Sequence, residues 1–170
     1  MLPDSSDTEK ARMDKSSSSL ERRRSAFSLS GNPLRRSSEP RRKIIAIGGG
    51  KGGIGKSMIA ANIGVHIAQT GGRVVMVDAD LGGANLHTCL GVGVPEATLT
   101  DFVTRKVDNL ADVVCPTSIP RLGLISGALD FLGAANPKYT QKLRLLRAIS
   151  RLDVDYVNID LGVGTGFNII

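Results

Sequence analysis

Short apolar runs alternate along the chain with segments in which apolar residues have helical spacing. The runs are interpreted as strands at Lys43–Gly48, Arg73–Asp78, Leu122–Ser126 and Tyr156–Asp160. The segments with helical spacing are Lys56–Thr70, Thr98–Arg105, Leu110–Val114 and Lys138–Leu152. Because strands alternate with helices, the pattern predicts an α/β fold in which a parallel sheet is covered by helices on both faces.

One helix follows this pattern closely, and one strand departs from it. In the first helix, apolar residues recur at Ile59, Ile63 and Ile67, and Gly71-Gly72 marks the end of the helix. The last strand contains a polar residue, Asn158, where an apolar residue is expected. A buried asparagine needs a hydrogen-bond partner, and the sequence does not identify that partner.

Composition limits the class of protein. The chain has 170 residues, which is enough for one domain with a hydrophobic core. No apolar run approaches the ~20 residues of a transmembrane helix, and the N-terminus has no apolar signal segment. Cys89 and Cys115 stand alone in separate segments and form no C-x-x-C pair, which favours a reducing cytoplasm.

The net charge of +6 is concentrated near the N-terminus. Residues 1–43 contain 11 Lys or Arg and 6 Asp or Glu, whereas residues 44–170 contain 11 and 10. Residues 1–42 are rich in Ser and Arg and lack a sustained apolar period, so we expect a disordered basic leader there and a folded domain over residues 43–170. The leader's Arg clusters are typical of segments that contact an anionic membrane, nucleic acid or an acidic protein, and a solvated tail is the alternative.

A glycine-rich segment lies between the first strand and the first helix. Gly50 to Ser57 matches the phosphate-loop pattern G-x-x-x-x-G-K-[ST] in the strand–loop–helix context that this pattern needs. Glycine accepts positive φ, so successive backbone N–H groups can turn inward and form a positive concavity with the helix N-terminus. In this motif Lys56 reaches the β- and γ-phosphates, and the Ser57 hydroxyl contacts Mg²⁺.

Three carboxylates close predicted strands. Asp78 and Asp80 follow the second strand, and Asp160 ends the fourth. In open α/β sheets the carboxyl ends of the strands line the ligand crevice, so we expect all three carboxylates to project toward the glycine-rich loop. They are candidates for holding Mg²⁺ on the phosphates and for placing a hydrolytic water.

These motifs resemble those of the MinD/ParA family of P-loop ATPases. Residues 51–57, KGGIGKS, resemble the deviant Walker A motif, whose mark is an additional lysine, here Lys51. Residues 78–86, DADLGGANL, are similar to the MinD and FlhG branch and lack the Pro-Gln pair that is usual in the ParA partition branch. Residues 160–164, DLGVG, resemble the switch II segment. The resemblance extends over residues 43–168 and implies a P-loop NTPase fold of the deviant Walker A type.

The resemblance also implies a role for each matching residue. Lys51 and Asp80 would be catalytic, because Lys51 would touch the γ-phosphate of ATP in the opposite subunit of an ATP-dependent homodimer and Asp80 would place or activate the attacking water. Lys56 would serve its own ATP. Mg²⁺ would be held by Ser57, Asp78 and Asp160. The residues expected to bind nucleotide are Gly50, Lys51, Gly52, Gly53, Ile54, Gly55, Lys56, Ser57 and Met58.

The implied function is that of a cytoplasmic, Mg²⁺-dependent ATPase that acts as a spatial switch, peripherally at the membrane or a cell pole, in flagellar placement or number or in division-site positioning. Domains of this family usually extend about a hundred residues further, within the common range of domain sizes. We therefore expect a C-terminally truncated domain, in which the strand before the loop has an uncovered edge.

Two other functions stay open from the sequence. The chain could be a catalytically inactive module that acts through its basic leader, since ATP turnover by a chain of this length is not established by the motifs. It could also be a ParA-like partition ATPase that binds DNA or cargo. The near-neutral charge of residues 44–170 and the missing Pro-Gln pair make DNA the weaker candidate.

Overall fold

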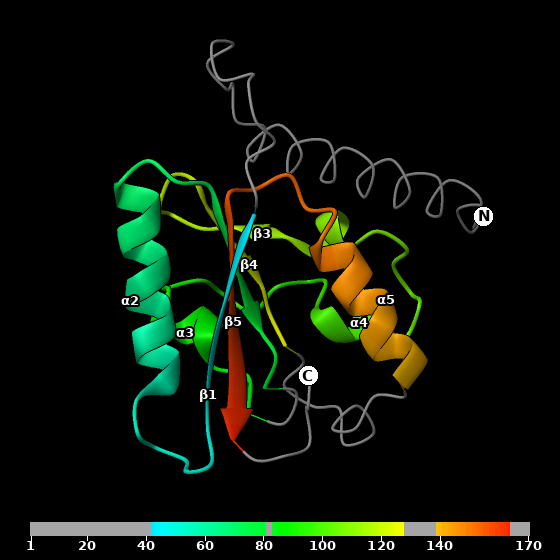
Figure 1. Cartoon of the computed structure of the whole chain (residues 1–170), viewed down its shortest axis with the longest axis horizontal. Coiled ribbons are helices and arrows are strands. Elements are labelled where there is room, and N and C mark those ends of the chain that lie inside the picture. Colours follow the sequence, from blue (N-terminus) through cyan, green and yellow to red (C-terminus); the bar gives the residue numbers. More distant parts are fainter. Residues whose placement is uncertain (1–41, 81–82, 128–138, 164–170) are drawn as a thin grey trace, which may run out of the picture.

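The computed structural model describes residues 42–80, 83–127 and 139–163. The expected leader, apart from Arg42, lies outside the described residues, as do Leu81, Gly82 and Gly164 of the motifs quoted above. Figure 1 shows a central sheet with helices on two sides. The elements in chain order are β1 (Lys43–Gly49), α2 (Lys56–Gln69), β2 (Val74–Asp78), α3 (Leu86–Cys89), α4 (Leu99–Val103), the 3₁₀ helix η1 (Leu110–Val113), β3 (Cys115–Pro116), β4 (Leu122–Ile125), α5 (Tyr139–Ile149) and β5 (Tyr156–Val163).

The sheet formed by the described residues has the strand order β1-β5-β2-β4-β3. The pairs β1–β5, β5–β2 and β2–β4 are parallel, and β3 pairs antiparallel with β4 at one edge. The predicted parallel sheet is therefore confirmed, with β3 as a short antiparallel addition that the apolar pattern does not indicate. On the opposite edge, β1 pairs with β5 alone among the described strands. Ile44 on that strand is 53% exposed, as expected for an uncovered edge.

The last strand in sequence, β5, inserts between the first two. Its residue Asp160 is in register with Ile47 of β1 on one side and with Asp78 of β2 on the other. The backbone N–H of Ala79 extends this pairing by donating to the Asp160 carbonyl at 2.8 Å. This order places Asp160 directly between β1, the strand that enters the glycine-rich loop, and Asp78 at the end of β2.

The two faces of the sheet carry separate hydrophobic clusters, because side chains alternate along each strand. Helices α2 and α3 cover one face, and α4, η1 and α5 cover the other (Figure 1). The cluster beneath α2 includes Val74, Met76, Leu122, Leu124, Ala60, Ala61 and Leu86. The cluster beneath α5 includes Val75, Val77, Ile125, Val157, Ile159, Phe102, Leu145 and Ile149.

Helix α2 packs on the sheet through small residues rather than through the isoleucines that mark its apolar period. Ile59 is 52% exposed, and Ile63 and Ile67 are only partly buried. A Cβ atom built on Gly64 would clash with the Met76 sulfur of β2 and lie 3.3 Å from its Cγ. The helix therefore approaches the strand closely at a glycine. The residues of α2 that are buried are Lys56, Ala60, Ala61, Gly64 and Ala68.

Helix α5 confirms the amphipathic pattern and ends earlier than predicted, at Ile149 instead of Leu152. The segment after the helix is tied to the start of β1, since the Arg42 guanidinium donates to the backbone oxygens of Ser150 and Leu152. Arg144 fastens α5 to α4, because its guanidinium stacks 4.2 Å from the centre of the Phe102 ring. None of the described helices combines the length and the apolar character that a bilayer crossing requires.

Candidate functional site

The segment between β1 and α2 turns sharply at two glycines. Gly53 has φ of 71° and Gly55 has φ of 86°, values that favour glycine because a side chain is strained there. Gly55 is the N-cap of α2, and its carbonyl accepts the N–H of Ile59 at 2.9 Å, which closes the first helical turn. The expected loop therefore ends where the motif places the start of the helix.

Three glycines of the loop border open space, which suits a phosphate. A Cβ atom on Gly50, Gly53 or Gly55 would meet no other protein atom within 4 Å, so packing does not explain these glycines. Positive φ explains the glycines at positions 53 and 55. Gly50 has neither a positive φ nor a close neighbour, and its lack of a side chain leaves room for a group from outside the chain. No side chain caps the N-terminus of α2, and no acidic residue lies in its first turn. These free N–H groups and the helix dipole favour an anion at this position.

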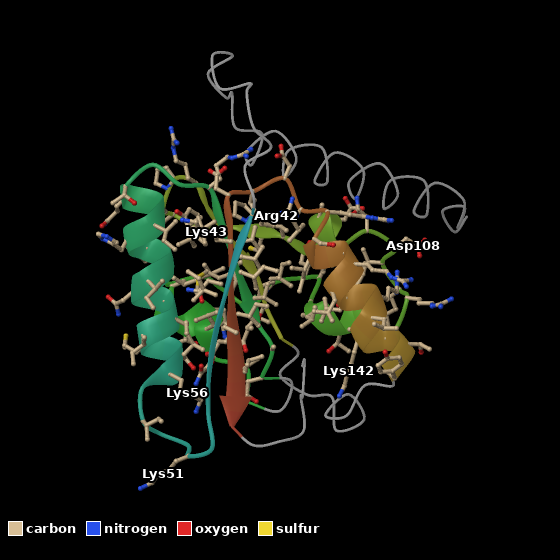
Figure 2. The ribbon with its side chains drawn as sticks, in the orientation of Figure 1. Arg42, Lys43, Lys51, Lys56, Asp108 and Lys142 are labelled. Carbon is tan, nitrogen blue, oxygen red and sulfur yellow. The ribbon has the colours of Figure 1, made fainter. Side chains whose placement is uncertain are left out.

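The two lysines of the loop have opposite environments. Lys56 is 8% exposed, and its ammonium donates to the Lys51 carbonyl at 3.1 Å. Lys51 is exposed and lies at the tip of the loop, pointing away from the domain, whereas Lys56 lies against the sheet side of α2 (Figure 2). Lys56 therefore contacts the loop of its own chain, whereas the side chain of Lys51 is directed away from the domain.

The remaining loop residues are accessible. Gly52, Ile54 and Met58 are exposed, with Ile54 at 56% and Met58 at 57%, and Ser57 is half-buried in the first turn of α2. Ser57 follows Lys56 directly, as the motif requires for a hydroxyl near the terminal phosphates. All nine residues expected to bind nucleotide therefore lie on one continuous loop and the first helical turn.

Asp78 and Asp160 are adjacent in the sheet. They are cross-strand partners on β2 and β5, and each is 1% exposed. Two buried carboxylates at neighbouring positions repel each other, and a cation or its phosphate complex would relieve that repulsion. Asp78 ends β2, as predicted, whereas Asp160 lies within β5, because that strand extends to Val163 and does not end at Asp160.

Asp78 organises the segment that follows β2, a function that the motif does not indicate. Its Oδ1 accepts the N–H of Asp80 at 3.1 Å, and its Oδ2 accepts the N–H of Leu86 at 3.0 Å. These bonds tie both ends of the 78–86 segment to one carboxylate. Gly127, which follows β4, packs closely against the same segment. A Cβ at position 127 would lie 3.1 Å from the Asp78 carbonyl oxygen and 3.2 Å from that of Asp80.

Asp80, the expected catalytic carboxylate, lies beyond the strand end and is half-buried. A Cβ on Gly83 would lie 3.3 Å from its Oδ2, so a glycine at position 83 keeps the space beside this carboxylate open. Asp80 is therefore restrained through its backbone N–H, which donates to Asp78, and its carboxylate lies close to Gly83.

The chemistry of these donors fits Mg²⁺ bound together with phosphate. In the described part of the chain, no three or more His, Cys, Asp or Glu side chains form a cluster that could hold a metal ion. Mg²⁺ commonly takes one or two carboxylates and completes its shell with water and substrate phosphates. Asp160 and the Ser57 hydroxyl supply such a small hard donor set, with Asp78 next to Asp160 in the sheet.

Burial raises the pKa of the Asp78 carboxyl to about 6, and repulsion from Asp160 and Asp80 acts in the same direction, while the N–H groups of Leu86 and Asp80 oppose the shift. An unfolded aspartate titrates near pH ~4, so between about pH 4 and about pH 6 the folded state binds more protons. Raising the pH through this window therefore favours unfolding. As the pH rises through this window, we expect the titration of Asp78 to lower the unfolding free energy of the metal-free protein by about 2–3 kcal/mol.

Urea unfolding in EDTA at several pH values between about pH 4 and about pH 7 measures this effect. The Asp78→Asn variant has no titrating group at this position, so the difference in stability between the two proteins should change with pH. Equal pH profiles for wild type and variant would contradict a raised pKa at Asp78.

Comparisons with known proteins agree with this architecture. A family model described as ParA, NUBPL iron-transfer P-loop NTPase, matches residues 41–169. The antiactivator FleN of Pseudomonas aeruginosa is 33% identical over 125 residues, which cover 72% of this chain and 44% of FleN. The iron-sulfur cluster carrier protein of Escherichia coli is 31% identical over 125 residues, which cover 74% of this chain and 33% of the carrier.

The fold is also found among solved structures. The septum site-determining protein MinD of Pyrococcus horikoshii, solved in complex with Mg-ADP, superposes with a TM-score of 0.65 at 30% identity. The match covers 73% of this chain and 50% of the MinD chain, so this chain spans half or less of the length of the three relatives named here. The expected resemblance and fold class are confirmed, and the chain belongs to the ParA family of P-loop NTPases.

Proposed function

We propose that this chain binds ATP with Mg²⁺ and forms part of an ATPase that switches between monomer and dimer. The observation that carries the proposal is the uncapped N-terminus of α2 behind an open glycine loop, with the buried ammonium of Lys56 at its base. The carboxylates of Asp78 and Asp160 are cross-strand partners on β2 and β5, and β5 pairs directly with β1, the strand that enters the loop. A MinD structure with this fold was solved with Mg-ADP, which supports the choice of ligand.

Each group has a defined task in this proposal. The N–H groups of the loop and the first turn of α2 hold the phosphates, and Lys56 neutralises the charge of the terminal phosphates. Bound Mg²⁺ would supply additional positive charge on the phosphate oxygens, held by Ser57 and Asp160 with Asp78 as the supporting carboxylate. Asp80 places or activates the attacking water, a role supported by the restraint of its backbone on Asp78, which fixes its position after β2.

The dimer proposal rests on the outward surface of the loop. Lys51 is exposed at the loop tip, and the large apolar side chains of Ile54, in the same loop, and Met58, in the first turn of α2, are more than half exposed. Exposed large apolar side chains are suited to a surface that becomes buried on a partner. In an ATP-bound pair, Lys51 would reach the phosphates of the other subunit, so nucleotide and contact between subunits would stabilise each other.

Size-exclusion chromatography of the full chain with and without ATP and Mg²⁺ tests this proposal. ATP is expected to shift the wild type from monomer to dimer. Lys51→Ala should remove the shift and leave binding of nucleotide to the monomer within about twofold, because Lys51 serves the other subunit's site. Lys106→Ala is the control, since Lys106 is 72% exposed and pairs with Asp101 next to α4. A Lys51→Ala protein that still dimerises with ATP would show that Lys51 has no role across the interface.

The proposed role is that of a spatial switch in the cytoplasm, peripheral at the membrane or a cell pole, which controls flagellar placement or division-site position. The names of two similar proteins, an antiactivator and a septum site-determining protein, support regulation rather than metabolism. The proposed contact of the leader with an anionic membrane or an acidic protein involves residues outside the described part of the chain.

A second candidate function is iron-sulfur carriage, favoured by the description of the family model and by the similarity to a cluster carrier. The chain has two cysteines, with Cys89 exposed and Cys115 half-buried, and they form no C-x-x-C pair. Anaerobic incubation with iron and sulfide tests this alternative. Visible absorption of a cluster that is lost in Cys89→Ser would favour carriage over a switch.

A further inference from the structure

Asn158 is a polar residue in the interior strand β5, which lies between β1 and β2. It is 0% exposed and is in register with Ile45 of β1 and Met76 of β2. Its Nδ2 donates to the backbone carbonyl of Ala60 in α2 at 2.9 Å. No donor in the described part of the chain lies within hydrogen-bond distance of its Oδ1. The partner that the sequence could not identify is therefore the helix that follows the loop.

Stability alone does not account for this asparagine. A buried amide with one oxygen unpaired costs free energy that an apolar side chain of similar volume does not. The flanking residues Val157 and Ile159 are buried and apolar, so the strand accepts such side chains. An asparagine at this position is explained better by what its hydrogen bond holds in place.

The bond joins the two elements that carry the proposed Mg²⁺ donors. Side chains alternate along a strand, so Asn158 and Asp160 face the same side of the sheet, about 6.6 Å apart along β5. Along α2, Ser57 precedes Ala60 by three residues, about 4.5 Å along the helix axis. Both steps lead from the Asn158–Ala60 bond toward the carboxyl edge of the sheet, where the loop lies.

We propose that Asn158 is a positioning residue that fixes α2 along its axis relative to β5. The hydrogen bond thereby sets the separation between the Ser57 hydroxyl and the Asp160 carboxylate. This inference rests on the proposed binding of nucleotide with Mg²⁺. Asn158 touches neither ligand, and its effect is on how strongly Mg²⁺ and nucleotide favour each other's binding.

The test is a titration of the full chain with a fluorescent ADP analogue, once with Mg²⁺ and once with EDTA. The ratio of the two affinities measures the coupling between Mg²⁺ and nucleotide. Asn158→Leu removes the amide at similar volume and is expected to reduce this ratio by at least about fivefold, within the usual range of coupling between sites. Its affinity in EDTA should stay within about twofold of wild type, because the loop and Lys56 are unchanged.

A matched control lies on the same helix. The Nδ2 of Asn62 donates to the Met58 carbonyl at 2.8 Å, the same type of bond, but on the exposed side of α2. Asn62→Leu should leave the coupling ratio unchanged. An unchanged ratio in Asn158→Leu, or an equal loss of affinity with and without Mg²⁺, would overturn the positioning role.

Two further outcomes are decisive. If Asn158→Leu does not fold, Asn158→Ala, which adds no volume, is analysed in the same way, and failure of both to fold would make Asn158 a purely structural residue and overturn the inference. If the wild type binds the analogue under neither condition, the proposed function itself fails. That result is distinct from a wild type that binds with a coupling ratio insensitive to Asn158.

Discussion

Replacing Lys56 by methionine is expected to weaken binding of a fluorescent ATP analogue by roughly 10- to 100-fold, the effect of losing a hydrogen bond between charged groups. Lys56 is buried at the base of the loop, with its ammonium held by the Lys51 carbonyl. The ammonium is thus placed before ligand arrives, and little side-chain entropy is lost on binding. Methionine keeps the apolar stem that lies near Gly49, so the loop should keep its shape.

Lys106→Met is the matched control for this change. It removes the same charge from a side chain that is 72% exposed beside α4. Fluorescence titration of both variants and circular dichroism at the same concentrations separate loss of binding from loss of fold. Unchanged affinity in a folded Lys56→Met protein would exclude the phosphate role of this lysine.

Gly64→Val is expected to lower the unfolding free energy by about 3 kcal/mol or more, at the upper end of the range for overpacked cores. The Cβ of any residue at position 64 would clash with the Met76 sulfur and lie 3.3 Å from Met76 Cγ and 3.4 Å from its Cε. Relief of this clash would move α2 away from β2.

The clash itself suggests a compensating change. All three atoms closest to a Cβ at position 64 belong to the Met76 side chain, so Gly64→Val with Met76→Ala should recover part of the loss, with a favourable interaction energy in the double-mutant cycle. Gly93→Val is the control, because a Cβ at position 93 meets no other protein atom within 4 Å. Urea unfolding of the wild type, the two single variants and the double variant gives these energies. Strict additivity of the two changes would contradict direct contact between positions 64 and 76.

Much of the site could be predicted because its signals are local. The loop needs glycines, two of them at positive φ, then a lysine and a serine at the start of a helix, and these residues are contiguous from Gly50 to Ser57. Asp78 directly follows an apolar, β-branched run, so its location at the end of β2 was also predictable, whereas β5 continues beyond Asp160 to Val163. The apolar pattern was less informative for α3 and β3, since elements of four and two residues are too short to show a period.

The buried side of α2 shows why pattern and packing differ. The spacing of Ile59, Ile63 and Ile67 indicates a helix correctly, yet Ile59 is 52% exposed and the helix packs through Gly64 and small residues. Which side of a helix is buried depends on how closely its partner approaches. Here the Met76 side chain fills the space that a larger residue on α2 would need.

The sequence by itself determined the alternation of strands and helices, the phosphate loop and the identity of the carboxylates, because each depends on residues close together in the chain. Only the tertiary structure decided that β5 lies between β1 and β2, which places Asp160 beside Asp78 and next to the loop strand. It also decided that Asn158 bonds to Ala60, 98 positions away in sequence. Strand order and register depend on which distant surfaces bury each other best, and no local pattern encodes that choice.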